Sequence, residues 1–330
     1  MNMKKALGII LVNIIVVVVL LVLVEGGVRV FSSNVVTQST DESILLEHRY
    51  GSTPGLKPLA VGEVFGKQVK VDAYGFLLNS CASKKKRKKI LFFGDSVTMG
   101  VGVESDSSFA ARLQHYFCDS LEIDNLSLIG YNINDYVRIT EKLHAEKTLQ
   151  LYDEVVVFFC LNDNFLSSAV HSSLNDASVF SSAMEWLKGK SYTYVALKGL
   201  ATDRSEAHYL FDKELYKNDT LLQNLNTKIA SLKSLVAPAK LSFVLLPYEY
   251  QLRENYANDC LPQQKLISIL NKEQISFLDA GKFLAKEGES EKDLYLYADG
   301  IHFSNEGHRA LFNIILSTKA ISSLTHTSPL

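Results

Sequence analysis

The chain has 330 residues, with 34 Lys and Arg against 36 Asp and Glu, so its formal net charge is −2 at pH 7. A charge this close to zero gives no bulk attraction to nucleic acid, and we expect no nucleic-acid partner. The length beyond the apolar N-terminal segment suits one large α/β domain and is too short for two substantial domains.

The first predicted element is a membrane-spanning helix. Residues 6–24 form a run of apolar side chains, chiefly Leu, Ile and Val, interrupted only by Gly8 and Asn13. This is about the length that a helix needs to cross a bilayer. A buried helix of a soluble domain is the less favoured alternative, because nearly every position around the helix is apolar.

The charges around this run predict its orientation. Lys4 and Lys5 precede it, whereas Glu25 and Arg29 offset each other just after it. This asymmetry predicts a cytoplasmic N-terminus and a large domain outside the cytoplasm, in the periplasm or at the cell surface. A cleavable signal peptide is the rival, but the apolar core is long and residues 24–27 lack a small-x-small cleavage site. We therefore predict a retained single-pass signal anchor over residues 1–25.

Residues 26–89 are expected to form a membrane-proximal stalk followed by a small β-rich cap, with a strand-like segment at 69–77. Six consecutive basic residues, 84–89, end this region. Such a run can bind nucleic acid or anionic lipid. Because it lies between a strand-like segment and the first strand of the sheet, we favour a solvated loop.

From residue 90 onward, strand-like and helical patterns alternate, which predicts βαβ units. The strand-like runs are residues 90–93, 123–128, 155–160, 241–246 and 275–278. The helical patterns are residues 109–117, 136–149, 221–236 and 263–271, and a last helix runs from Ser304 to about Ile321. The predicted fold is α/β, with a three-layer, doubly wound parallel sheet over residues 90–322, the N-terminal transmembrane helix before it and a tail at 323–330.

Polar or small residues follow the first three strands. The first strand leads into Gly94-Asp95-Ser96, so a tight turn would expose the serine at the carboxyl edge of the sheet, where open α/β sheets place their ligands. Gly130 follows the second strand and Asn162 the third. Taken singly, these residues suit a helix cap or an ordinary turn.

The far end of the domain supplies Asp299-Gly300-Ile301-His302. An Asp three residues before a His, in a glycine-containing loop, can hold the imidazole in one tautomer and aim it at Ser96. An unactivated alcohol is a weak nucleophile at neutral pH, so a serine that cleaves esters needs such a base. The pair favours a serine hydrolase over an isolated turn serine.

In these motifs the chain resembles the GDSL/SGNH hydrolase superfamily, over roughly residues 88–320. Its four blocks occur in the family's order, as Gly94-Asp95-Ser96, Gly130, Asn162-Asp163 and Asp299 to His302. The resemblance implies catalytic roles for Ser96, Asp299 and His302. It also implies an oxyanion hole made by the backbone N–H groups of Ser96 and Gly130 and the side-chain amide of Asn162.

One position departs from the family pattern, whose third block is usually Gly-x-Asn-Asp. Cys160 stands at the glycine position, which puts the shape of the pocket in question more than the reaction. We expect Cys160 to be an inert, buried thiol at the end of a strand. The other cysteines, Cys81, Cys118 and Cys260, show no regular spacing but are compatible with disulfides in an oxidising compartment.

No metal or cofactor is expected. The histidines lack the spacing of zinc ligands, and the chain has no Gly-rich phosphate loop. His308 falls near the start of the last helix and is expected to be exposed.

Between residues 164 and 218 the periodicity fades, and the segment carries Trp186 with several tyrosines and many serines. An insertion of this length could form a lid or one wall of the substrate cleft. Tyr248 and Tyr250, beyond the fourth strand, could stack on a sugar ring. Aromatic side chains more often cover apolar surface, so we do not count these two among the site residues.

The predicted function is a serine esterase that hydrolyses acyl esters, O-acetyl esters above all, through an acyl-serine intermediate on cell-envelope glycan or lipid. An O-acyltransferase would resolve the same intermediate with a sugar hydroxyl in place of water, and the sequence does not separate the two. A non-catalytic envelope-assembly or glycan-binding protein is the alternative from another class. The expected partners are the ester substrate and the membrane, and the oligomeric state is left open.

Overall fold

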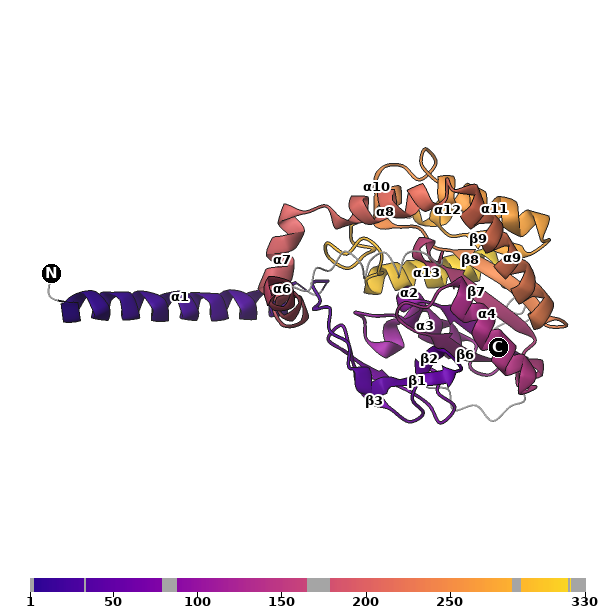
Figure 1. The fold of residues 1–330 in the computed structure, drawn as a ribbon, viewed down its shortest axis with the longest axis horizontal. Coiled ribbons are helices and arrows are strands. Elements are labelled where there is room, and N and C mark those ends of the chain that lie inside the picture. Colours follow the sequence, from indigo (N-terminus) through magenta and orange to yellow (C-terminus); the bar gives the residue numbers. More distant parts are fainter. Residues whose placement is uncertain are drawn as a thin grey trace.

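The computed structural model describes residues 3–32, 34–78, 88–164, 179–286, 292–319 and 321. Figure 1 shows a rounded body from which a single long helix projects. Four features of the sequence lie outside the described residues: Cys81, residues 84–87 of the basic run, residues 165–178 of the insertion and the tail.

A parallel sheet of five strands forms the centre of the body, in the order β6-β5-β7-β8-β9. The strands are β5 (Lys88–Gly94), β6 (Leu121–Ser127), β7 (Glu154–Phe159), β8 (Lys240–Leu245) and β9 (Ser276–Asp279). The apolar residues of β5 and β7 are fully buried, as expected for strands covered on both faces. The predicted doubly wound parallel sheet is confirmed.

Two groups of helices flank this sheet. In one group α3 (Phe109–Tyr116) and α12 (Gly281–Leu284) contact α13 (Asn305–Thr318); in the other α4 (Ile133–Ala145) and α11 (Leu261–Lys272) contact α9 (Asp219–Val236). The helix predicted at 136–149 begins and ends earlier than expected. It begins earlier because Asn132 and Asp135 form a capping box, and it ends before Lys147, whose φ is +59°.

Residues before the sheet form two antiparallel hairpins, β1 (Leu45–Tyr50) with β2 (Thr53–Leu56), and β3 (Val61–Val64) with β4 (Lys67–Lys70). Beyond them, the backbone N–H of Leu77 donates to the carbonyl of Asn125 in β6. This contact covers part of the edge of the sheet. The basic run differs from the expected loop at its end, since Lys88 and Lys89 open β5, and Lys89 pairs with Glu122 and Asp124.

The insertion after β7 contains three described helices, α6 (Val179–Lys190), α7 (Tyr192–Ala201) and α8 (Arg204–Leu215). Helix α8 packs on α10 (Glu249–Arg253), which follows β8, and α7 packs on the projecting helix α1 (Met3–Phe31). The insertion therefore contacts both α10 of the body and the N-terminal helix α1.

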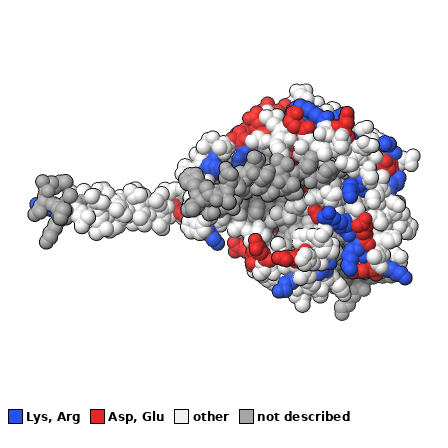
Figure 2. Space-filling model, in the orientation of Figure 1, with Lys and Arg blue, Asp and Glu red and all other residues white. Residues whose placement is uncertain are grey.

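Helix α1 is the one described helix that is long and apolar enough to cross a membrane, over Leu7–Phe31, and its apolar window has no part buried in the body. Figure 2 shows no charged side chain along most of its length. A helix of this kind near an N-terminus suits either a membrane anchor or a signal sequence.

The predicted exposure of His308 is wrong, since its residue surface is only 1% exposed. His308 shares the inner face of α13 with Leu311 and Ile315, at helical spacing. Its Nδ1 accepts the backbone N–H of Phe109 at 3.3 Å. Burial lowers the pKa of His308 to about 3, so this imidazole is a neutral part of the core.

Candidate active site

The loops that carry the predicted site residues meet at one edge of the sheet. Gly94, at the end of β5, is in register with Ser127 of β6 and Phe158 of β7. The carboxyl ends of these three neighbouring strands therefore lie together, and so do the loops that follow them. The segment containing Asp299 reaches the same region, where the carbonyl of Gly300 accepts the backbone N–H of Glu249 at 2.9 Å.

Ser96 is the first residue of the short helix α2 (Ser96–Met99). Asp95 caps this helix, because its carboxylate accepts the backbone N–H of Val97 at 2.9 Å. The turn into the helix is tight enough to require glycine at position 94, where a Cβ atom would lie 2.0 Å from the Thr98 hydroxyl oxygen. The sequence thus holds Ser96 at the strand's end through a glycine turn and a helix cap.

Ser96, His302 and Asp299 form a continuous chain of hydrogen bonds. The Ser96 hydroxyl donates to His302 Nε2 at 2.8 Å, and His302 Nδ1–H donates to Asp299 Oδ1 at 2.7 Å. Asp299 Oδ1 also accepts the backbone N–H groups of Ile301 and His302, at 3.1 and 2.9 Å. An ionised carboxylate can only accept, so this geometry fixes the proton of the imidazole on Nδ1.

The electrostatics of the pair follow from burial and mutual attraction. Burial by itself would raise the pKa of Asp299, but the neighbouring His302 and its hydrogen bonds hold that pKa well below its ordinary value. Burial by itself would lower the pKa of His302, and the charge of Asp299 outweighs it, so the pKa of His302 is raised. The site therefore stabilises the imidazolium that forms when His302 takes up a proton.

The side-chain amide of Asn162 has a defined orientation. Its Nδ2 donates to Asp95 Oδ2 at 3.1 Å, while its Oδ1 faces the hydroxyl of Tyr248 at 3.3 Å. The single proton of the Tyr248 hydroxyl is shared between this oxygen and Asp212 Oδ2, which is 2.6 Å from the hydroxyl. Because the Asp95 carboxylate can only accept, the amide points its N–H groups toward Asp95, the residue beside Ser96.

Gly130 lies three residues beyond the end of β6, and its φ is +80°. This left-handed conformation is readily available only to glycine. A Cβ atom at this position would meet no heavy atom within 4 Å, so the Cα of Gly130 faces open space. All five predicted site residues are thus placed at one edge, and three of them are joined directly.

A protein-family comparison covers most of this body. The model of the GDSL-like lipase/acylhydrolase family matches residues 92–310, which includes all the residues of the candidate site. The chain belongs to the GDSL-like lipase/acylhydrolase family. It is accordingly a hydrolase of ester bonds.

Several solved structures resemble this GDSL-like hydrolase at low sequence identity. The crystal structure of TesA has 16% identity and a TM-score of 0.44, covering 72% of this chain and 99% of that one. A lipase/acylhydrolase from Enterococcus faecalis has 15% identity and a TM-score of 0.44, covering 74% and 98%. An acetylxylan esterase mutant from Geobacillus stearothermophilus has 17% identity and a TM-score of 0.42, covering 71% and 94%. Comparison with the curated proteins finds no match.

The residue that departs from the family pattern does not reach the surface of the hydrolase. Cys160 is fully buried and is a free cysteine. Burial raises the pKa of its thiol well above the ordinary value, so the side chain stays neutral, as predicted. The neighbouring Asp163 fixes this turn, because its Oδ2 accepts the backbone N–H of Cys160 at 3.1 Å and the Tyr136 hydroxyl at 2.8 Å.

Two residues of the N-terminal region contact Asp299 and His302, and the sequence motifs did not indicate them. Gln38 donates from Nε2 to Asp299 Oδ2 at 3.3 Å. The ring of Phe65 meets the His302 imidazole edge-on, with centroids 5.4 Å apart. Neither residue belongs to a sequence motif, because each reaches the site only through the packing of segments that are more than 200 positions apart in the sequence.

Tyr248 and Tyr250 differ from the sugar platform considered above. Tyr248 is fully buried behind Asn162, so its ring has no exposed face. Tyr250 is partly buried, stacks on Tyr209 and donates its hydroxyl to Glu206 at 3.2 Å. The buried hydroxyl of Tyr248 is thus a partner of a site residue, which no pattern in the sequence signalled.

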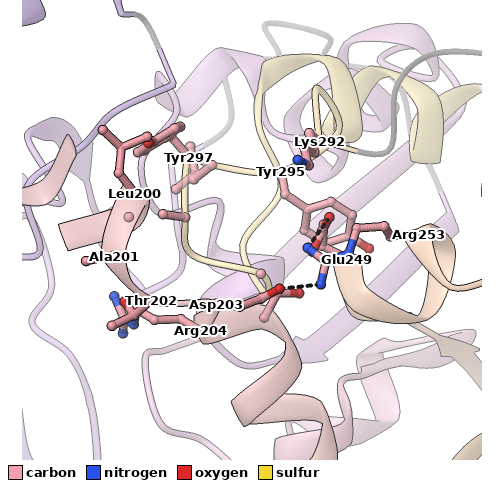
Figure 3. A pocket seen from close by; sticks show the side chains of 15 residues that line it. Leu200, Ala201, Thr202, Asp203, Arg204, Glu249, Arg253, Lys292, Tyr295 and Tyr297 are labelled. Carbon is pink, nitrogen blue, oxygen red and sulfur yellow. Dashed lines mark hydrogen bonds and ion pairs between the residues drawn. The ribbon is translucent and has the colours of Figure 1, made fainter. Parts of the chain in front are cut away.

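A cavity of about 460 Å³ lies next to the segment that carries Asp299. Its wall includes Ala298 and Gly300, on either side of Asp299, together with the turn between α7 and α8, and it does not include Ser96. Figure 3 shows Arg253 paired with Asp203 across this cavity, whereas the Arg204 guanidinium points away from that pair. Within the described ranges no group of three or more His, Cys, Asp or Glu could hold a metal ion.

Proposed function

We propose that this GDSL-like hydrolase is a membrane-anchored serine esterase that removes acyl groups, chiefly acetyl, from cell-envelope glycan outside the cytoplasm. The observation that carries the proposal is the hydrogen-bonded chain from the Ser96 hydroxyl through His302 to Asp299. This arrangement supplies a nucleophile, a base within hydrogen-bond reach and a group that orients the base.

In the proposed reaction, Ser96 Oγ attacks the ester carbonyl carbon as its proton passes to His302 Nε2. The tetrahedral intermediate then collapses: the bond from carbon to the alcohol oxygen breaks, and that oxygen takes the proton from His302. An acyl-serine remains. A water molecule then attacks the acyl carbon and loses one proton to His302. The bond from that carbon to Ser96 Oγ breaks, Ser96 Oγ takes the proton from His302, and the carboxylic acid leaves with the second proton of the water and ionises in solution. Asp299 stabilises the imidazolium in both halves.

The oxyanion of each tetrahedral intermediate would be bound by the backbone N–H groups of Ser96 and Gly130 and by Nδ2 of Asn162. Fixed donors at that position lower the barrier without reorganising solvent. Asn162 Nδ2 carries two protons. Asp95 accepts one of them, which holds the amide beside Ser96.

The proposed location follows from the N-terminal segment. The two lysines before the apolar run of α1 favour a cytoplasmic N-terminus, which would put the body outside. Cys118 is in a disulfide bond, and such bonds persist in oxidising compartments. An enzyme held there would meet O-acylated envelope glycans, and this supports acetyl esters of glycan over other substrates.

The test uses the full chain in detergent with chromogenic p-nitrophenyl esters of increasing acyl length, beside acetylated glycan with acetate release as the readout. We expect the acetyl ester to be cleaved fastest, and we expect Ser96→Ala to lose at least about 10³-fold in kcat. A preference for long acyl chains would contradict an acetylated glycan as the substrate and would favour a lipid ester. Equal activity in the alanine variant would remove Ser96 as the nucleophile.

A further inference from the structure

Helices α6 and α7 are joined to α1 where its apolar run ends. The Glu25 carboxylate accepts the backbone N–H groups of Tyr192 and Thr193, at 3.0 and 2.9 Å, and the hydroxyl of Ser191 at 3.0 Å. The two backbone N–H groups belong to the first turn of α7, where they have no carbonyl partner within the helix. Glu25 therefore fixes the start of α7 to one position along the N-terminal helix.

A second contact strengthens this junction. Arg29 donates to the backbone carbonyl of Lys190, at the end of α6, at 3.1 Å. Its guanidinium also lies over the Tyr192 ring, 4.7 Å from the centroid. The end of α6 and the start of α7 are both held by charged side chains of α1.

The position of Glu25 sets the depth of the junction in a membrane. The apolar residues 6–24, as a helix, span about 28 Å, close to the roughly 30 Å hydrocarbon core of a bilayer. Glu25 follows this run directly, so it would lie at the boundary between acyl chains and headgroups. Figure 1 shows α7 running across the axis of α1 at this end. With α1 spanning the bilayer, α7 would lie along the membrane surface.

The two helices expose apolar and basic side chains at this level. The large apolar ones are Trp186, Leu197 and Leu200, which are 64%, 61% and 79% exposed. The exposed basic one is Lys190, which has no ion-pair partner in the described part of the chain. Lys188 and Lys198 are partly buried and line a small cavity with Ala298, so they are not part of this surface.

Tryptophan, leucine and lysine side chains on a helix at headgroup depth are typical of segments that lie in the membrane interface. We propose that the interfacial surface, made of Trp186, Leu197 and Leu200 with Lys190, lies in the membrane interface, where its apolar side chains reach the acyl chains and Lys190 binds the phosphates of anionic lipids. The proposal rests on the membrane location proposed above. It adds a second membrane contact beside the anchor.

This contact has a consequence for the site. Gly199 of α7 packs against Ala298, where a Cβ atom on the glycine would come within 2.4 Å of the Ala298 side chain. Ala298 directly precedes Asp299. The interfacial surface would therefore hold the triad loop near the membrane surface and keep the body from turning freely about α1.

Trp186 is the chain's single tryptophan, so tryptophan emission reports on this surface alone. The experiment places the full chain in vesicles of phosphatidylcholine and phosphatidylglycerol, with acyl chains either unmodified or brominated. We expect bromination to lower the emission about twofold or more, because bromine quenches only at contact and Trp186 would lie at acyl-chain depth. Unchanged emission from a chain that floats with the vesicles would overturn the proposal.

Charge and apolar contact are tested by two variants. Lys190→Gln should lower the extra quenching that phosphatidylglycerol gives over pure phosphatidylcholine; the matched control is Lys57→Gln, at another exposed position. Leu197→Asp/Leu200→Asp should lose quenching in both lipids. Quenching that is the same in all variants would contradict the proposal. Emission that changes with protein concentration but not with bromination would also contradict it, because this result is expected if a second copy of the chain covers the surface.

Two further readouts separate this proposal from the earlier ones. Hydrolysis of p-nitrophenyl acetate in the same samples tests the esterase and the fold of each variant, independently of the membrane. Flotation tests the anchor. A chain that floats and hydrolyses the ester without quenching would overturn the interfacial surface alone, whereas a chain that fails to float would overturn both the anchor and the surface.

Discussion

His302 lies between two partners, and each fixes one of its nitrogens. Ser96 donates to Nε2, and Asp299 accepts from Nδ1. The aspartate has a further donor in Gln38, on its second oxygen. Both oxygens of the carboxylate therefore have donors, which holds the carboxylate in place and, through it, the imidazole.

The pH dependence of the esterase should report His302. The imidazole must be neutral to take the Ser96 proton, so kcat/KM should rise as pH passes upward through its pKa, which Asp299 raises above the ordinary value. In Asp299→Asn we expect kcat/KM to fall roughly 10³–10⁴-fold. We also expect the rising limb of its pH profile to move to lower pH, because the charge that raises the pKa of His302 is gone. A rate profile measured on a neutral acetyl ester checks both. A variant limb at the same pH as in the wild type would contradict the proposed pairing.

Tyr248 should act on the reaction through Asn162. Replacement by Phe removes the hydroxyl that faces the Asn162 Oδ1 but leaves the ring in the core. Since loss of a whole oxyanion donor costs about 10²–10³-fold in kcat, we expect Tyr248→Phe to lower kcat by about tenfold with little change in KM. Tyr250→Phe, whose hydroxyl contacts Glu206 instead, is the matched control. A change confined to KM, or an equal effect of both variants, would refute the role of Tyr248.

At the scale of elements, the sheet was the most predictable part of the molecule. The central strands β5 and β7 hold uninterrupted apolar runs, and each of the five strands was predicted to within two residues of its observed bounds. The turns after them carry recognisable residue types. Helix α8 gave no such signal, because its inner face includes Ser205 and Asp212 as well as Tyr209, so its apolar periodicity is weak.

Contacts between distant elements account for what the sequence did not predict. Gln38 and Phe65 sit in irregular segments around the hairpins, and only packing brings them to His302 and Asp299. Asp212 acts on Asn162 through a tyrosine from a different loop. His308 has a polar side chain on the buried face of a helix, where residue type alone favours exposure.

The junction between α1 and α7 has a local stability that can be measured. Glu25→Ala removes the acceptor for the Tyr192 and Thr193 amides. Loss of a helix cap costs typically about 1 kcal/mol, so these two amides should exchange with deuterium about fivefold faster, while the amides of the central sheet should be unaffected. Glu47→Ala, at an exposed position of β1, is the control. Unchanged exchange at Tyr192 and Thr193 would show that the junction does not depend on Glu25.

At the scale of the whole molecule, the N-terminal region does more than connect the body to α1. It covers one edge of the sheet through Leu77, donates to the triad acid through Gln38 and lies against the triad imidazole through Phe65. The anchor, the hairpins and the hydrolase body are thereby coupled at the site itself. We expect that a chain lacking the segment before the sheet would be impaired in catalysis as well as in location.

The proposed topology predicts the side of the membrane on which the body lies. Alkaline phosphatase, which needs an oxidising compartment for its disulfides, should be active when fused after residue 330. A fusion that replaces Lys4 and Lys5 by Glu should have lower activity, because the charge asymmetry that orients α1 is reversed. An inactive fusion of the unaltered chain would place the body in the cytoplasm and contradict the topology.

The central claim is that Ser96 is a nucleophile activated by His302. It is tested most directly by treating the folded full chain with a fluorophosphonate and locating the adduct by peptide mass spectrometry. We predict a single adduct on Ser96, none in Ser96→Ala, and labelling slowed by orders of magnitude in His302→Ala. Labelling at another residue, or an unchanged rate without the imidazole, would contradict the account.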